Sequence, residues 1–125
     1  MVQFARLVGF SLLFSLGLGS VMSAENFDGL YYPEGQSYLC DDNLYHPGET
    51  DGLSLIDGDK YLSVESSCEF SNASNLQDLH AVLIDVKCMS EGEAHNYRMM
   101  LLKADGGIYK ITKQMVLFRK KCLPY

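Results

Sequence analysis

The sequence lacks the short motifs by which many catalytic sites are recognised. No serine lies in a G-x-S-x-G elbow, the four cysteines form no C-x-x-C pair, and 125 residues hold only three histidines. The missing elbow gives no support to an α/β-type hydrolase, and the missing cysteine pair gives none to a thiol oxidoreductase. We therefore assign no catalytic residue and no metal ligand, and we expect no cofactor.

Basic residues are scarce. The chain has 10 Lys and Arg residues against 16 Asp and Glu residues, and its one dense basic cluster is RKK at 119–121. Residues 25–125 hold all 16 acidic residues and nine of the basic ones, a formal charge of −7. Such a composition argues against binding to nucleic acid or to an anionic lipid surface, and it suits a cationic partner.

A long apolar run occurs only near the N-terminus. One positive charge, at Arg6, precedes a largely apolar run at 7–18 and small residues that end at Ala24. This order is typical of a secretory signal peptide, and the run is shorter than the roughly 20 residues of a membrane span. We expect residues 1–24 to be a signal peptide and residues 25–125 to be a single exported domain, periplasmic or secreted, with no membrane span.

The four cysteines are widely spaced and all lie in the exported part, at Cys40, Cys68, Cys88 and Cys122. An even number of dispersed cysteines in an exported chain predicts two disulfides, for which three connectivities are possible. We favour Cys40 with Cys68 and Cys88 with Cys122, because each pair encloses a consecutive segment. Each bond would add about 3 to 4 kcal/mol of stability in the chain-entropy account, which is much for a small domain.

Turn signals divide the exported part into short segments. β-branched and aromatic runs lie between the turns, and no stretch has sustained helical periodicity. This pattern predicts an all-β fold, a small antiparallel meander, sandwich or partly closed barrel of six or seven strands. The turn signals lie at 33–35, 46–48, 50–52, 57–59, 71–75, 90–93 and 105–107.

Alternation along the strands predicts the buried face. Folding the chain back across SEGE at 90–93 is predicted to bring Leu102, Met100 and Arg98 opposite Ile84, Val86 and Cys88. We treat 60–70 as one strand. The predicted inward face, which ends with Cys122, carries Leu62, Val64, Cys68, Phe70, Val82, Ile84, Val86, Cys88, Met100, Leu102, Tyr109, Ile111, Val116 and Phe118. The other face is also partly apolar, so the sheet is sandwiched, closed or docked on a partner.

The stretch CDDNLYHPGETD at 40–51 is the candidate interaction loop. It carries Asp41, Asp42, His46 and Glu49. Such oxygen-rich loops can bind calcium, and paired carboxylates can serve acid/base chemistry, but the EF-hand spacing is absent and Pro-Gly inside the loop indicates an ordinary turn.

The stretch DVKCMSEGEAH at 85–95 gathers a thiol, a thioether, carboxylates and an imidazole. These groups would suit copper or zinc. However, Cys88 and Met89 are adjacent and point to opposite faces of a strand, and EGE is typical of a hairpin tip. We therefore interpret the stretch as half of a disulfide beside a turn.

Several segments together resemble a group of small exported bacterial proteins that have four cysteines and no assigned activity. The resemblance covers residues 29–122 and implies a scaffold of cysteines, turns and strand ends, with no catalytic residue to carry over. The segments are GLYYPEGQSYLCDD at 29–42, VESSC at 64–68, DVKCMSEGE at 85–93, the following Arg98, and KKC at 120–122.

The function that we expect is a non-enzymatic binding module of the cell envelope, which contacts another envelope or extracellular protein. One concrete form is an inhibitor of a secreted hydrolase, for which a small, acidic, disulfide-bonded β domain would suit a cationic enzyme. The alternatives are a small hydrolase or metal-dependent enzyme that uses Asp41, Asp42 and His46, and a small-ligand carrier with a barrel cavity.

Overall fold

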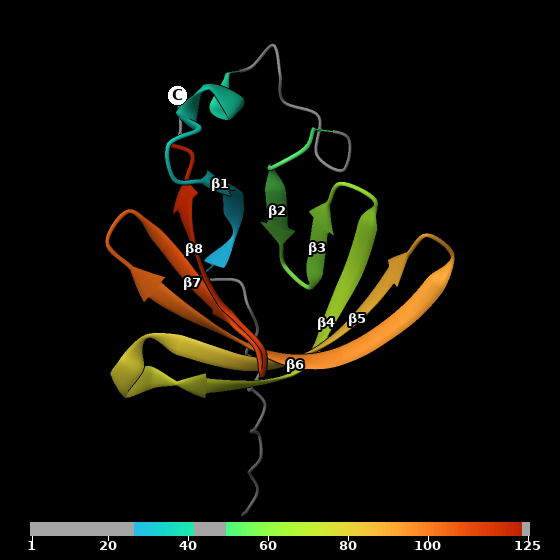
Figure 1. Cartoon of the computed structure of the whole chain (residues 1–125). Helices are drawn as coiled ribbons and strands as arrows, with labels where there is room; N and C mark the ends of the chain where they lie inside the picture. The colour runs from blue at the N-terminus through green and yellow to red at the C-terminus, as the bar shows by residue number, and fades with distance from the viewer. Residues whose placement is uncertain (1–26, 42–49, 124–125) are drawn as a thin grey trace, which may run out of the picture.

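The computed structural model describes residues 27–41 and 50–123 (Figure 1). Within this part the chain forms eight strands and two short 3-10 turns, η2 (Ser37–Cys40) and η4 (Gln77–Leu79). The strands are β1 (Gly29–Pro33), β2 (Ser54–Asp57), β3 (Lys60–Ser63), β4 (Ser66–Leu76), β5 (Ala81–Ser90), β6 (Glu93–Ala104), β7 (Gly107–Ile111) and β8 (Val116–Lys121).

The eight strands form a closed antiparallel barrel. Each strand pairs with its neighbour in sequence, and β1 pairs with β8 to close the sheet. In Figure 1 the long strands β4, β5 and β6 form a curved sheet, from which the shorter strands rise on either side. The all-β antiparallel prediction is confirmed, with eight strands in place of six or seven.

The core follows from the alternation in β5. Val82, Ile84 and Val86 point into the barrel and are almost fully buried, while Lys87 between Val86 and Cys88 is exposed. Opposite them, β6 contributes Leu101, which is 0 % exposed. A side-chain period of two therefore separates the barrel interior from the outer face, as a half-buried strand requires.

The predicted register of the β5–β6 hairpin is wrong. The turn has two residues, Glu91 and Gly92, with φ of 52° and 83°, which is the geometry of a primed turn. Ile84 therefore faces Met99 and not Leu102. The predicted and observed registers differ by three residues, and an odd shift moves every side chain to the other face.

The register error in β6 also changes which faces of β7 and β8 are buried. The register of both later hairpins is as predicted, since Tyr109 pairs with Leu102 and with Phe118. The face that we expected to be buried nevertheless lies outside, because those strands inherit their orientation from β6. The outward residues are Met100, Leu102, Tyr109, Ile111, Val116 and Phe118, and the buried ones are Met99, Leu101 and Ile108.

The expected single strand at 60–70 is two strands. The chain turns at Glu65, whose φ of 63° is in the left-handed region, so that β3 and β4 form a hairpin. Tyr61 is the buried residue of β3, whereas Leu62 and Val64 are half-buried. Within the predicted strand 60–70, the even-numbered residues are therefore buried only at Cys68 and Phe70.

The preferred disulfide pairing is also wrong, although the number of disulfides is as predicted. Cys68 bonds to Cys88, and Cys40 bonds to Cys122. The β3–β4 turn places Cys68 directly opposite Cys88 on the neighbouring strand β5. Barrel closure places Cys122 beside β1, where its amide donates a hydrogen bond to the Leu30 carbonyl at 2.7 Å, close to η2. Two disulfides are typical of an oxidising compartment.

Candidate functional site

The predicted interaction loop is only partly described. Asp42, His46 and Glu49 lie outside the described residues, so their role stays a prediction. Asp41 is exposed and lies beside the Cys40–Cys122 disulfide, where it lines a shallow pocket of about 400 Å³ together with Tyr38, Leu123 and Lys121. The described part of the loop thus contributes one carboxylate to a small, mostly apolar surface.

The stretch at 85–95 is a disulfide followed by a hairpin. Cys88 is bonded to Cys68, so its sulfur offers no thiolate to a metal, and the exposed Met89 points away from it. His95 Nε2 lies 4.0 Å from Glu93 Oε1 in an exposed pair. Across residues 27–41 and 50–123, no three His, Cys, Asp or Glu side chains come together in a metal-binding arrangement.

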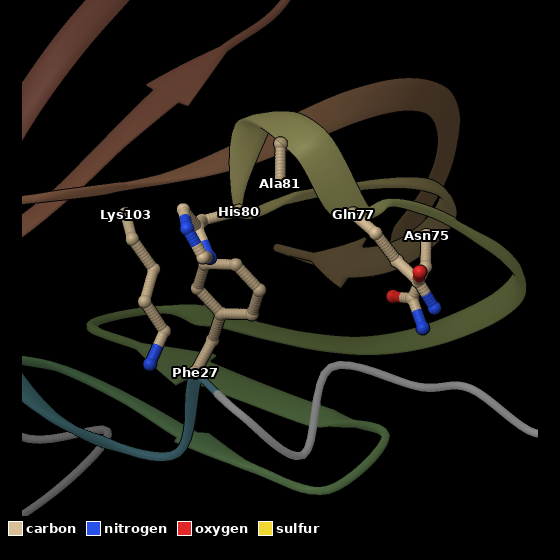
Figure 2. Close-up of a pocket in the computed structure, with 6 residues that line it drawn as sticks. All are labelled: Phe27, Asn75, Gln77, His80, Ala81 and Lys103. Atoms are coloured by element: carbon tan, nitrogen blue, oxygen red, sulfur yellow. The ribbon is translucent and has the colours of Figure 1, made fainter.

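A pocket of about 360 Å³ lies near the N-terminal end of the described chain (Figure 2). Phe27 lines it and is buried, and the Lys103 Nζ lies 5.5 Å from the centre of that ring. His80 is in a left-handed conformation and its carbonyl accepts a hydrogen bond from the Lys103 amide at 3.0 Å. Asn75 and Gln77 line the pocket with amides. Among the described residues, no carboxylate lines it.

A cationic cluster lies inside the barrel. The Lys110 amine of β7 donates a hydrogen bond to the Tyr61 hydroxyl of β3 and lies 4.7 Å from the centre of the Tyr61 ring, which stacks on Phe70. Burial, and then the nearby Arg119 guanidinium, lower the pKa of Lys110 to about 8. Burial raises the pKa of Tyr61, although the same guanidinium opposes the rise. This contact therefore joins a neutral phenol to an ammonium that deprotonates easily.

The sequence interpretation missed Lys110 and Tyr61. Lys110 shares its strand face with Ile108, which is buried, and it pairs with the buried Leu101. The predicted register places Tyr109 on the buried face and so gives no reason to single out Lys110. With the correct two-residue turn, the alternation in GIYKI would have placed a lysine in the core.

Charge is divided between the two halves of the chain. Residues 25–78 hold twelve acidic residues and one basic residue, Lys60, whereas residues 79–125 hold four acidic and eight basic residues. The boundary falls between β4 and β5. We call β1–β4 the acidic half and β5–β8 the basic half of the barrel. The net charge of −6 hides this division.

No protein-family model, curated protein or solved structure matches this chain. No helix in the described segments is long and apolar enough to cross a bilayer. The function is therefore argued from the geometry and the charge of the barrel.

Proposed function

We propose that the protein is an exported, non-enzymatic binding module whose acidic half, β1–β4, docks on a cationic protein, and that a secreted hydrolase inhibited in this way is the concrete form. The observation that carries this proposal is the segregation of twelve acidic residues against one basic residue in 25–78. An electrostatic potential of one sign over one side of a small domain raises the rate of association with a partner of opposite charge.

The hairpin between β2 and β3 carries two of these acidic residues at its tip. Asp57 and Asp59 are exposed on either side of Gly58. The Gly58 amide donates a hydrogen bond to Asp28 Oδ1 at 2.8 Å, which ties the tip of the hairpin to the start of β1. A fixed tip supports binding, because less conformational freedom is lost when a partner docks.

An apolar row accompanies these charges. Leu30, Leu55 and Leu62 are aligned across β1, β2 and β3, and all three are half-buried. Asp57 follows Leu55 by two residues and therefore shares its face. Apolar side chains with a charged rim form the usual arrangement of a protein interface. The acidic half has both the apolar row and the charged side chains beside it.

The experiment compares two matched sets of neutralised carboxylates. One variant carries Asp57→Asn, Asp59→Asn and Glu65→Gln in the acidic half. The control carries Glu91→Gln, Glu93→Gln and Asp105→Asn in the basic half and has the same net charge. Surface plasmon resonance against panels of basic and of acidic secreted hydrolases measures the association rate, and a turnover assay measures inhibition.

We expect a basic hydrolase to bind and to be inhibited. The association rate should fall about tenfold for the first variant and about twofold or less for the control, because steering depends on where the charge lies. Equal binding of acidic hydrolases, or equal losses in both variants, would contradict the proposal. A substrate turned over by the protein itself, with turnover lost in the Asp41→Ala, Asp42→Ala, His46→Ala variant, would support the enzyme alternative in its place.

A further inference from the structure

A larger cavity lies in the basic half, where β6, β7 and the turn at 112–115 meet. Its volume is about 1050 Å³. Six of its 13 lining residues have aliphatic or methionine side chains, and methionine in particular adapts to flexible apolar ligands. These residues are Leu83, Met99, Met100, Ile111, Met115 and Leu117.

The charged side chains that line this cavity are all cationic. They are Arg98, Lys110 and Lys113. Arg98 is neutralised by Asp85, with 2.8 Å between Nε and Oδ1, and Lys113 is exposed. Lys110 takes part in none of the ion pairs of the described residues, and its bond to the Tyr61 hydroxyl uses one of its three N–H groups. The half-buried Lys110 ammonium, with two N–H groups outside its bond to Tyr61, therefore borders an apolar cavity.

We propose that this cavity binds a single-chain amphiphile with an anionic head, such as a medium-chain carboxylate. The head accepts hydrogen bonds from the Lys110 amine, and the chain lies along the methionine and leucine side chains of β5, β6 and β8. An anion is the charge that compensates a half-buried ammonium, and a carboxylate oxygen is the acceptor it lacks. The site belongs to the basic half and is independent of the docking surface proposed above.

Titration of Lys110 gives the proposal a pH signature. Its pKa is about 8 in the unliganded barrel, and a bound anion favours the ammonium and raises that value. Binding is therefore strongest below pH 8 and weakens up to tenfold per pH unit above it. The groups that face Lys110 are Tyr61 from β3, Tyr97 from β6 and Arg119 from β8. Burial raises the pKa of both tyrosines, so they stay neutral in this range.

The test uses the exported protein and isothermal titration calorimetry with dodecanoate, decanoate and dodecyltrimethylammonium, all below their micelle concentrations. Lys110→Met removes the charge and keeps an apolar chain. Lys87→Met is the matched control, because Lys87 is an exposed lysine of β5 outside the cavity. Circular dichroism checks the fold of each variant, and the pH dependence of wild-type binding needs no variant.

We expect dodecanoate to bind at least tenfold more tightly than dodecyltrimethylammonium, and decanoate to bind about tenfold or more weakly than dodecanoate because two methylenes are lost. Lys110→Met should lose tenfold or more in dodecanoate affinity, and Lys87→Met should not. Equal binding of the cationic amphiphile, or wild-type affinity that is constant from pH 7 to pH 10, would overturn the proposal. So would binding to vesicles of anionic phospholipid without binding to monomeric dodecanoate.

Discussion

The acidic and basic halves of the barrel share one architecture and differ in what their side chains offer. Each half is a four-stranded antiparallel meander, and β1–β8 and β4–β5 are the two seams between them. The acidic half carries exposed carboxylates around a leucine row, while the basic half carries a cavity lined by methionine and lysine. Net charge alone would therefore mislead about partners, because the two halves of the chain carry opposite net charge.

Both disulfides cross from one half to the other. Cys68–Cys88 bridges β4 to β5, and Cys40–Cys122 bridges η2, which follows β1, to the residue after β8. Each covalent bond therefore lies at one of the two seams. This placement keeps the halves together where their contact would otherwise depend on the backbone ladder and the shared core.

The largest effect is expected at these seams. Cys40→Ala with Cys122→Ala opens a loop of 82 residues in sequence separation, and Cys68→Ala with Cys88→Ala opens one of 20. Chain entropy predicts losses of about 4.5 and about 3.3 kcal/mol in the free energy of unfolding. Urea denaturation of the oxidised proteins measures both. A larger loss from the shorter loop would show that packing of the buried Cys68 and Cys88, and not chain entropy, dominates.

The next effect separates the inner from the outer face of the basic half. Leu101 is 0 % exposed, and its neighbour Leu102 is half-buried on the outside. Leu101→Ala should lower the free energy of unfolding by about 2 to 5 kcal/mol, because it leaves a cavity in the core. Leu102→Ala should cost about 1 kcal/mol or less. The reverse order, measured by urea denaturation, would favour the predicted register, in which Ile84 faces Leu102.

This pair also shows what the sequence could reveal. Turn spacing and alternation were sufficient for the fold class, for the number of disulfides and for two of the three C-terminal hairpin registers. The β5–β6 hairpin required a choice of where the turn in SEGE is centred: the observed pairing is centred between Glu91 and Gly92, whereas pairing Ile84 with Leu102 centres it on Glu93. Because side chains alternate, that one choice decided which residues of β6, β7 and β8 are buried.

The candidate sites were less predictable than the fold. Disulfide pairing depends on which strands become neighbours, and barrel closure brings Cys40 to Cys122 across most of the chain. The Lys110–Tyr61 contact joins β7 to β3 across the interior, a distance of 49 residues in sequence. Local patterns contain no information about such contacts. The division of charge, by contrast, could have been counted directly from the sequence.

The smallest effect concerns the buried cation that distinguishes the basic half. The pKa of Lys110 falls from 10.5 to about 8 on folding, so between these values the unfolded chain binds more protons than the folded barrel. The free energy of unfolding should therefore rise with pH above 8, by up to about 2 kcal/mol at pH 10. Above pH 10 the trend should reverse, because burial raises the pKa of Tyr31, Tyr61 and Tyr97 and their ionisation favours the unfolded chain.

Thermal denaturation between pH 7 and pH 10 measures this trend in the wild type, in Lys110→Met and in the Lys87→Met control. The rise should be absent in Lys110→Met, which has no amine to deprotonate at this position, and it should persist in Lys87→Met. Saturating dodecanoate should flatten the wild-type curve as well, because an anion beside the ammonium removes the reason for its low pKa. A rise that survives in Lys110→Met would place the titrating group elsewhere, and it would separate the charge of the basic half from its cavity.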